Sequence, residues 1–125
     1  MKHLLTEEEL TGDPEFMVAV IEAGSASGVY PDSEVNLVYV PERVMERILG
    51  VAKAYQLKFP EHASRDPSVR WVYRSTQVEW VIDELEFLHS LLNDQLLNGY
   101  ISKMLVLAST VLSRPHKLEL AFEGP

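Results

Sequence analysis

The most concentrated charge in the chain lies in the segment that follows Thr76. Glu79, Asp83 and Glu86 step by four and three residues, so on a helix they form one acidic stripe, with Glu84 at its edge. Lysine and arginine side chains of a second protein bind such a row of carboxylates, which also speeds the encounter. These four residues are therefore the predicted partner-binding site. The alternative is that the stripe is only a solvent-exposed outer face of the helix, which is the more frequent case for a run of charge.

A metal site is the second chemistry to consider on this segment. Glu86 and His89 form a Glu-x-x-His step of the kind found in di-metal carboxylate helix bundles. Those bundles need a second such step and two more inward glutamates, but the segment 94–113 has no carboxylate after Asp94 and no histidine. The same shortage argues against an all-helical nucleotide pyrophosphohydrolase, which holds Mg²⁺ between two acidic helices. The sequence therefore predicts no metal and no cofactor.

Catalytic motifs are incomplete. The segment Gly24–Gly28 has the small residues of a phosphate-binding loop, but no lysine is near it. Ala26 stands where a nucleophile elbow carries serine. The histidines have no metal-ligand or His-Glu-x-x-His spacing; they are His3, His62, His89 and His116. No catalytic residue is assigned, and a Ser–His–Asp assembly formed only in space stays open.

Two arginines offer an alternative site. Arg70 and Arg74 belong to a predicted strand and are expected on its wet face, about 13 Å apart, while Trp71 points to the core. At that spacing they could grip an anionic ligand, with Tyr30 beside them. This hypothesis makes the chain a small-ligand-binding or hydrolytic domain with a pocket near the 24–33 loop. Pairing with some of the 19 acidic residues is the simpler interpretation.

Three segments alternate with the period of two that strands show, and they are 35–40, 69–74 and 117–123. Because each of the last two segments has one polar, solvent-facing side, they favour a small, partly antiparallel sheet covered by helices on one face. The segment Asp13–Ala23 is predicted to be a helix, since Asp-Pro-Glu is a helix-start signal. A short helical turn over Thr6–Leu10 is expected before it.

Three further segments have helical spacing. Pro41 is the expected first residue of one helix, and Pro60 ends it. A capping box, Thr76–Glu79, opens the next. Its apolar seam comprises Val78, Val81, Leu85, Leu88 and Leu92. The last helix runs from about Asp94 to Ser113. Because few residues join these two helices, we expect an antiparallel pair. The seam should face Leu97, Ile101, Met104, Ala108 and Val111.

Length and composition set the class of protein. The 125 residues, 46% of them apolar, predict one globular α+β domain over 1–125, with about three strands and three to four helices. The absence of cysteine excludes a disulfide scaffold, a thiolate zinc site and a cysteine nucleophile. The net charge of −8 argues against binding duplex nucleic acid or an anionic membrane.

The expected location is the cytoplasm. The first ten residues lack the apolar stretch of a signal peptide. The most apolar region, 96–112, is interrupted by polar residues and is a poor membrane span.

The sequence favours a small acidic, non-enzymatic protein that occupies a basic protein partner, as immunity proteins, antitoxins and phage-encoded inhibitors do. The ligand-binding domain described above is one alternative. An oligomeric structural or assembly subunit is the other, because the 94–113 helix carries only Lys103 as a charge between its ends and could form a homo-oligomer interface.

Overall fold

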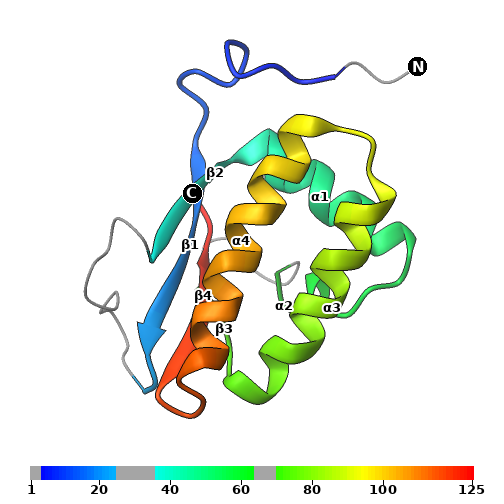
Figure 1. Ribbon diagram of the computed structural model, residues 1–125. Helices are drawn as coiled ribbons and strands as arrows, with labels where there is room; N and C mark the ends of the chain where they lie inside the picture. The colour runs from blue at the N-terminus through cyan, green and yellow to red at the C-terminus, as the bar shows by residue number, and fades with distance from the viewer. Residues whose placement is uncertain (1–3, 25–35, 64–69) are drawn as a thin grey trace.

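Four antiparallel strands form one sheet in the order β2-β1-β4-β3 (Figure 1). The computed structural model describes residues 4–24, 36–63 and 70–125. The elements are β1 (Glu15–Glu22), β2 (Leu37–Pro41), α1 (Glu42–Ala54), α2 (Pro60–Ala63), β3 (Trp71–Tyr73), α3 (Ser75–Leu91), α4 (Gln95–Ser113) and β4 (Leu118–Glu123). The α+β class is confirmed, although the sheet has four strands where about three were predicted.

Strand β1 corrects one prediction, because Asp13–Ala23 was expected to be a helix. The segment pairs with β2 on one side and with β4 on the other. Val18 and Val20 are buried in the main core, while Ala19 and Ile21 are buried in a second cluster on the opposite face. With both faces covered, the strand shows no alternation of apolar and polar residues. Its β-branched side chains suit a strand better than a helix.

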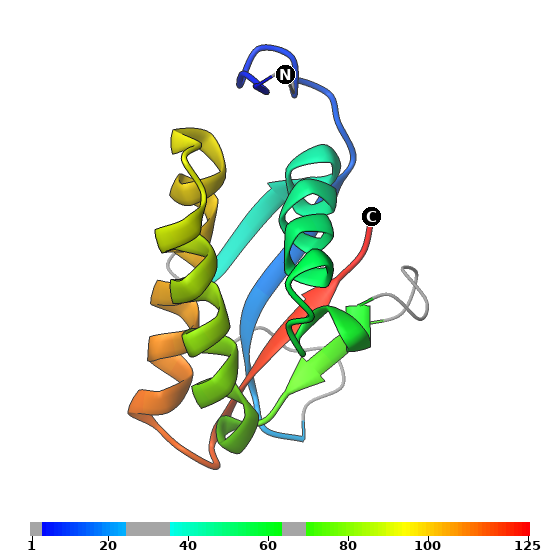
Figure 2. The same cartoon turned by 90° about the vertical axis from the view of Figure 1, so that its right-hand side faces the viewer.

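Helices α3 and α4 form the predicted antiparallel pair against the sheet. Leu85 and Met104, at the centre of the two seams, are fully buried in the main core. Figure 2 shows α1 beside this pair, with strands visible between and behind the helices. In the described ranges, α4 is the one helix that is long and apolar enough to cross a membrane, by length and composition only. In this structure the apolar side of α4 is buried in the core of the same chain, while Val106 stays exposed.

The starts of two helices differ slightly from the prediction. Helix α1 begins at Glu42, so Pro41 is the last residue of β2. Helix α3 begins at Ser75, and Gln77 Oε1 accepts the Arg74 N–H at 2.9 Å. The capping interaction therefore lies two residues before the predicted box at Thr76–Glu79.

The start of α4 agrees with the prediction. Asp94 Oδ1 accepts the N–H groups of Leu96 and Leu97 at 3.0 and 3.2 Å. This cap satisfies backbone donors that the first helical turn leaves free. It fixes the short connection that turns the chain from α3 back along α4.

Candidate functional site: the outer face of α3

The acidic stripe points to solvent, because burial of the apolar seam fixes how α3 is rotated. Glu79, Asp83 and Glu86 are all exposed. Within the described ranges, their carboxylates make no hydrogen bond or ion pair. Like charges at these spacings repel one another mildly, by about 0.2–0.5 kcal/mol per pair. The stripe is therefore a row of negative charge whose oxygens are open to a ligand.

Glu84 does not share this freedom, although the sequence placed it with the stripe. Its side chain is half-buried, and its two carboxylate oxygens accept the backbone N–H groups of Lys58 and Phe59 at 2.8 Å each. Tyr73 reaches the same connection, since its hydroxyl donates to the carbonyl of Phe59. Burial raises the pKa of Tyr73, so this phenol remains a donor. Glu84 therefore holds the chain before α2 against α3.

Replacing Glu84 should destabilise the protein, whereas replacing its neighbour Glu86 should not. In Glu84→Gln, the amide nitrogen faces one of the two backbone N–H groups, so one charge-assisted hydrogen bond is lost. The expected decrease in the free energy of unfolding is about 1–3 kcal/mol. Glu86→Gln removes the same charge from a carboxylate that makes no hydrogen bond or ion pair in the described ranges. It should change the free energy of unfolding by less than about 0.5 kcal/mol. Urea unfolding compares the two, and equal stabilities would contradict the role assigned to Glu84.

Exposed apolar side chains continue the line of the stripe. Phe87 and Leu91 follow Glu79 and Asp83 in steps of four, and their residues are 40% and 39% exposed. The Phe87 ring meets the Tyr55 ring edge-on at a centroid distance of 5.5 Å. Tyr55 is itself 52% exposed. We name Tyr55, Phe87 and Leu91 the apolar patch. Aromatic side chains are enriched at protein-binding surfaces, which have a polar rim.

The described structure includes the two arginines of the alternative site but not its tyrosine or most of its loop. Arg70 Nη2 forms an ion pair with Glu123 Oε2 at 3.3 Å, in agreement with the simpler interpretation of its charge. Arg74 lies beyond the end of β3, as the residue before α3. Tyr30, and all of the 24–33 loop except Gly24, lie outside the described residues.

The start of α3 brings together a serine, a histidine and a carboxylate. Ser75, Glu79 and His116 line a hollow of 250 Å³. Ser75 Oγ is buried and accepts the backbone N–H of His116 at 3.2 Å. In the part of the chain that is described, no hydrogen bond joins the His116 ring to the serine. The arrangement therefore lacks the base–nucleophile contact that hydrolysis needs.

In the described ranges, no group of three or more histidine and carboxylate side chains lies close enough to hold a metal ion. His89, the second residue of the Glu-x-x-His step, is exposed on α3. The step therefore gains no third ligand from another described element.

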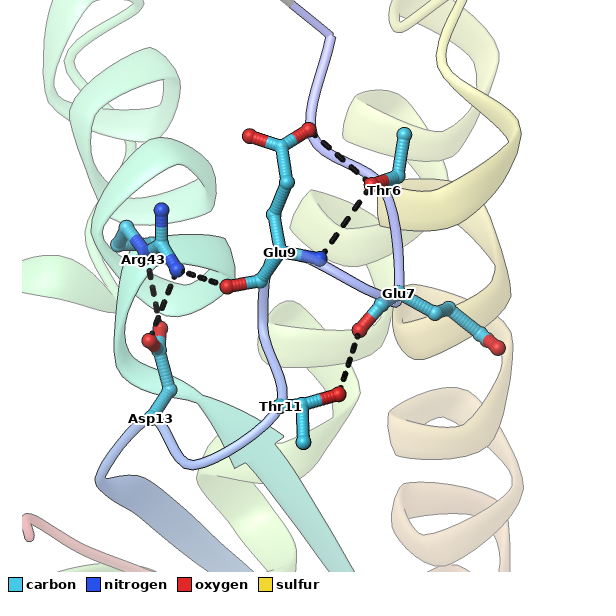
Figure 3. Close-up of polar contacts among 6 residues, drawn as sticks. All are labelled: Thr6, Glu7, Glu9, Thr11, Asp13 and Arg43. Atoms are coloured by element: carbon cyan, nitrogen blue, oxygen red, sulfur yellow. Dashed lines mark hydrogen bonds and ion pairs between the residues drawn. The ribbon is translucent and has the colours of Figure 1, made fainter.

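A second acidic run, near the N-terminus, is tied into the fold by Arg43 of α1 (Figure 3). Arg43 binds the Asp13 carboxylate through Nε at 3.0 Å and Nη2 at 2.9 Å, and it also donates to the Glu9 carbonyl. Thr6 Oγ1 donates to Glu9 Oε1 at 3.1 Å. Hydrogen bonding to Arg43 lowers the pKa of Asp13 below its ordinary 3.8. The carboxylates of Asp13 and Glu9 thus accept hydrogen bonds from side chains of the same protein, unlike those of the acidic stripe.

The clamp between Arg43 and Asp13 should open in acid. Because folding lowers the pKa of Asp13, its contribution to stability is complete above the ordinary pKa of 3.8 and is lost as the pH falls through the lowered value. The backbone N–H of Asp13, which bonds to the Leu10 carbonyl at 3.0 Å, should then lose protection, measured as its exchange rate relative to that of an unstructured peptide at the same pH. Arg43→Gln should show low protection at neutral pH too. A protection factor in the wild type that stays constant through this acid range would contradict the clamp.

Comparisons with known proteins find no family model that matches the chain, and no curated protein or solved structure matches it either. Any function assigned to the chain therefore rests on its own side chains. Those on α3 combine exposed carboxylates that make no hydrogen bond or ion pair in the described ranges with exposed aromatic and aliphatic groups.

Proposed function

We propose that the chain is a small acidic, non-enzymatic binding protein that occupies a basic protein partner in the cytoplasm. Immunity proteins, antitoxins and phage-encoded inhibitors act in this way. The observation that supports the proposal is the contrast along α3. Glu84 uses both carboxylate oxygens inside the fold, whereas the carboxylates of the acidic stripe are exposed and make no hydrogen bond or ion pair within the described ranges.

An exposed acidic stripe suits this role for two physical reasons. Its carboxylates remain hydrated, so they destabilise the fold only by weak mutual repulsion. From Glu79 to Glu86 the stripe extends about 10 Å along the helix, enough to meet two or three lysine or arginine side chains. The net charge of −8 adds a long-range attraction for a basic protein and speeds its association.

Capture of a partner tests the proposal. The protein is immobilised, exposed to an extract of its native host at about 50 mM salt and eluted at about 500 mM, where charge interactions are screened. The matched control is the triple variant Glu79→Gln, Asp83→Asn and Glu86→Gln. The proposal expects one or more basic proteins that the wild type retains and the triple variant does not. Identical sets of retained proteins would refute a role for the stripe.

A further inference from the structure

A groove of 630 Å³ lies between α1 and the turn from α3 into α4. Its wall on α1 is the face that carries Arg43, Glu46, Arg47, Gly50 and Ala54, which recur in steps of three and four. The remaining lining residues are mainly apolar, and they are Leu4, Leu5, Val51, Tyr55, Leu92, Asp94 and Leu97. The carboxylate of Asp94 already caps α4. Gly50 leaves the middle of the α1 wall open, since an added Cβ there would meet nothing within 4 Å.

The groove is continuous with the apolar patch on α3. Tyr55 lines the groove and also contacts Phe87, while Leu91 directly precedes Leu92 in the groove wall. Asp83 lies one helical turn before Phe87 on the same line of α3. The groove, the apolar patch and the acidic stripe therefore form one surface, apolar along its middle and acidic along one side.

Among the described residues of this surface, the charged side chains that make no hydrogen bond or ion pair are carboxylates. Arg43 is neutralised by Asp13, and Arg47 already takes part in an interaction of its own. Lys53, also on α1, lines a different hollow beside Gln56 and Leu57. Glu46 is exposed at the groove, and in the described ranges its carboxylate makes no hydrogen bond or ion pair.

We propose that this surface binds a basic amphipathic helix of the partner protein, an inference that rests on the proposed function. Apolar side chains at helical spacing would enter the groove and cover the apolar patch. Lysine and arginine side chains on the flank of that helix would then meet the acidic stripe and Glu46. The line from Glu79 to Leu91 extends about 18 Å, so a partner helix of about three to four turns matches it.

The probe for this proposal is a synthetic leucine–lysine peptide of about 18 residues, long enough for a helix once bound. Its leucines have helical spacing, and a control peptide has the same composition with the leucines redistributed so that no helical face forms. Titration calorimetry gives both dissociation constants. The proposal expects the amphipathic peptide to bind at least about tenfold more tightly than the control peptide. Equal affinities, or no binding of either peptide, would overturn it.

A pair of glycine variants tests whether the peptide occupies the groove. Gly50 and Gly99 are both exposed helical residues with nothing within 4 Å of an added Cβ, but only Gly50 lines the groove. Both Gly50→Leu and Gly99→Leu should fold with an equal or higher melting temperature, because glycine is a poor helix former. Gly50→Leu should weaken binding of the amphipathic peptide by about tenfold or more, and Gly99→Leu should leave it unchanged.

The outcomes separate the groove from the proposed function. If the triple variant of the acidic stripe loses the peptide and Gly50→Leu retains it fully, the groove inference is wrong and the stripe remains a binding site. If neither change affects binding, the groove inference and the proposed function both lose this support. If sedimentation shows that the protein forms a dimer and that Gly50→Leu dissociates it, a second copy is the occupant and the peptide proposal is overturned.

Discussion

Leu85→Ala is expected to lower the free energy of unfolding by about 3 kcal/mol. Leu85 lies at the centre of the apolar seam and is fully buried in the main core. The substitution removes apolar contacts and leaves a cavity between α3 and its neighbours, which can close only in part. Urea unfolding measures the loss, provided that the slope of the transition is unchanged.

The control lies two residues along the same helix. Phe87 is larger than Leu85, but it is 40% exposed. Phe87→Ala should therefore lower the free energy of unfolding by about 1 kcal/mol or less, mainly through its contact with Tyr55. If Phe87→Ala were the more damaging change, α3 would be rotated differently and the acidic stripe would not face solvent.

In contrast to Leu85→Ala, neutralising the acidic stripe is expected to have little effect on stability and a large effect on binding. The triple variant Glu79→Gln, Asp83→Asn and Glu86→Gln should melt at the same temperature or slightly higher, because mutual repulsion is relieved. Its association with the captured basic protein should slow by about tenfold or more at low salt. Surface plasmon resonance and thermal melting measure the two effects separately.

A second triple variant controls for net charge. Glu7, Glu8 and Glu22 are exposed, and their carboxylates make no hydrogen bond or ion pair in the described part of the chain. Changing all three to Gln moves the net charge from −8 to −5, as the stripe variant does. We expect this control to associate much faster than the stripe variant. Equal rates would mean that overall charge, and not the stripe, steers the partner.

The acidic stripe and the seam were predictable because both repeat along one helix. Once the spacing of Val78, Val81 and Leu85 fixes the buried side of α3, the exposed side follows from helix geometry. The cap at Asp94 was also predictable, since the side chain of Asp accepts the N–H groups of the residues that follow it.

Strand β1 was mistaken for a helix because it lies in the middle of the sheet. A central strand with both faces covered loses its alternating pattern, and Asp13-Pro14-Glu15 then gave a misleading start signal. The β-branched residues Val18, Val20 and Ile21 carried the correct information.

Glu84 and the groove depend on contacts between elements, which the spacing of residues does not record. The chain around Lys58 and Phe59 meets Glu84 only after α1 and α3 have packed together. The groove combines residues of the N-terminal segment, α1 and the turn into α4. Gly50 does not give a distinguishing signal, because Gly99 is likewise a glycine within a helix and does not line the groove.

The most direct test of the central claim is the salt dependence of association with the captured partner. The association rate constant of the wild-type protein is measured between about 50 mM and about 500 mM salt, where screening of exposed charges increases steeply. If the stripe steers a basic partner, the rate should fall by at least about tenfold over this range, and the rate of the stripe variant should vary much less. A wild-type rate that is independent of salt, or equal salt dependence in both proteins, would contradict the account.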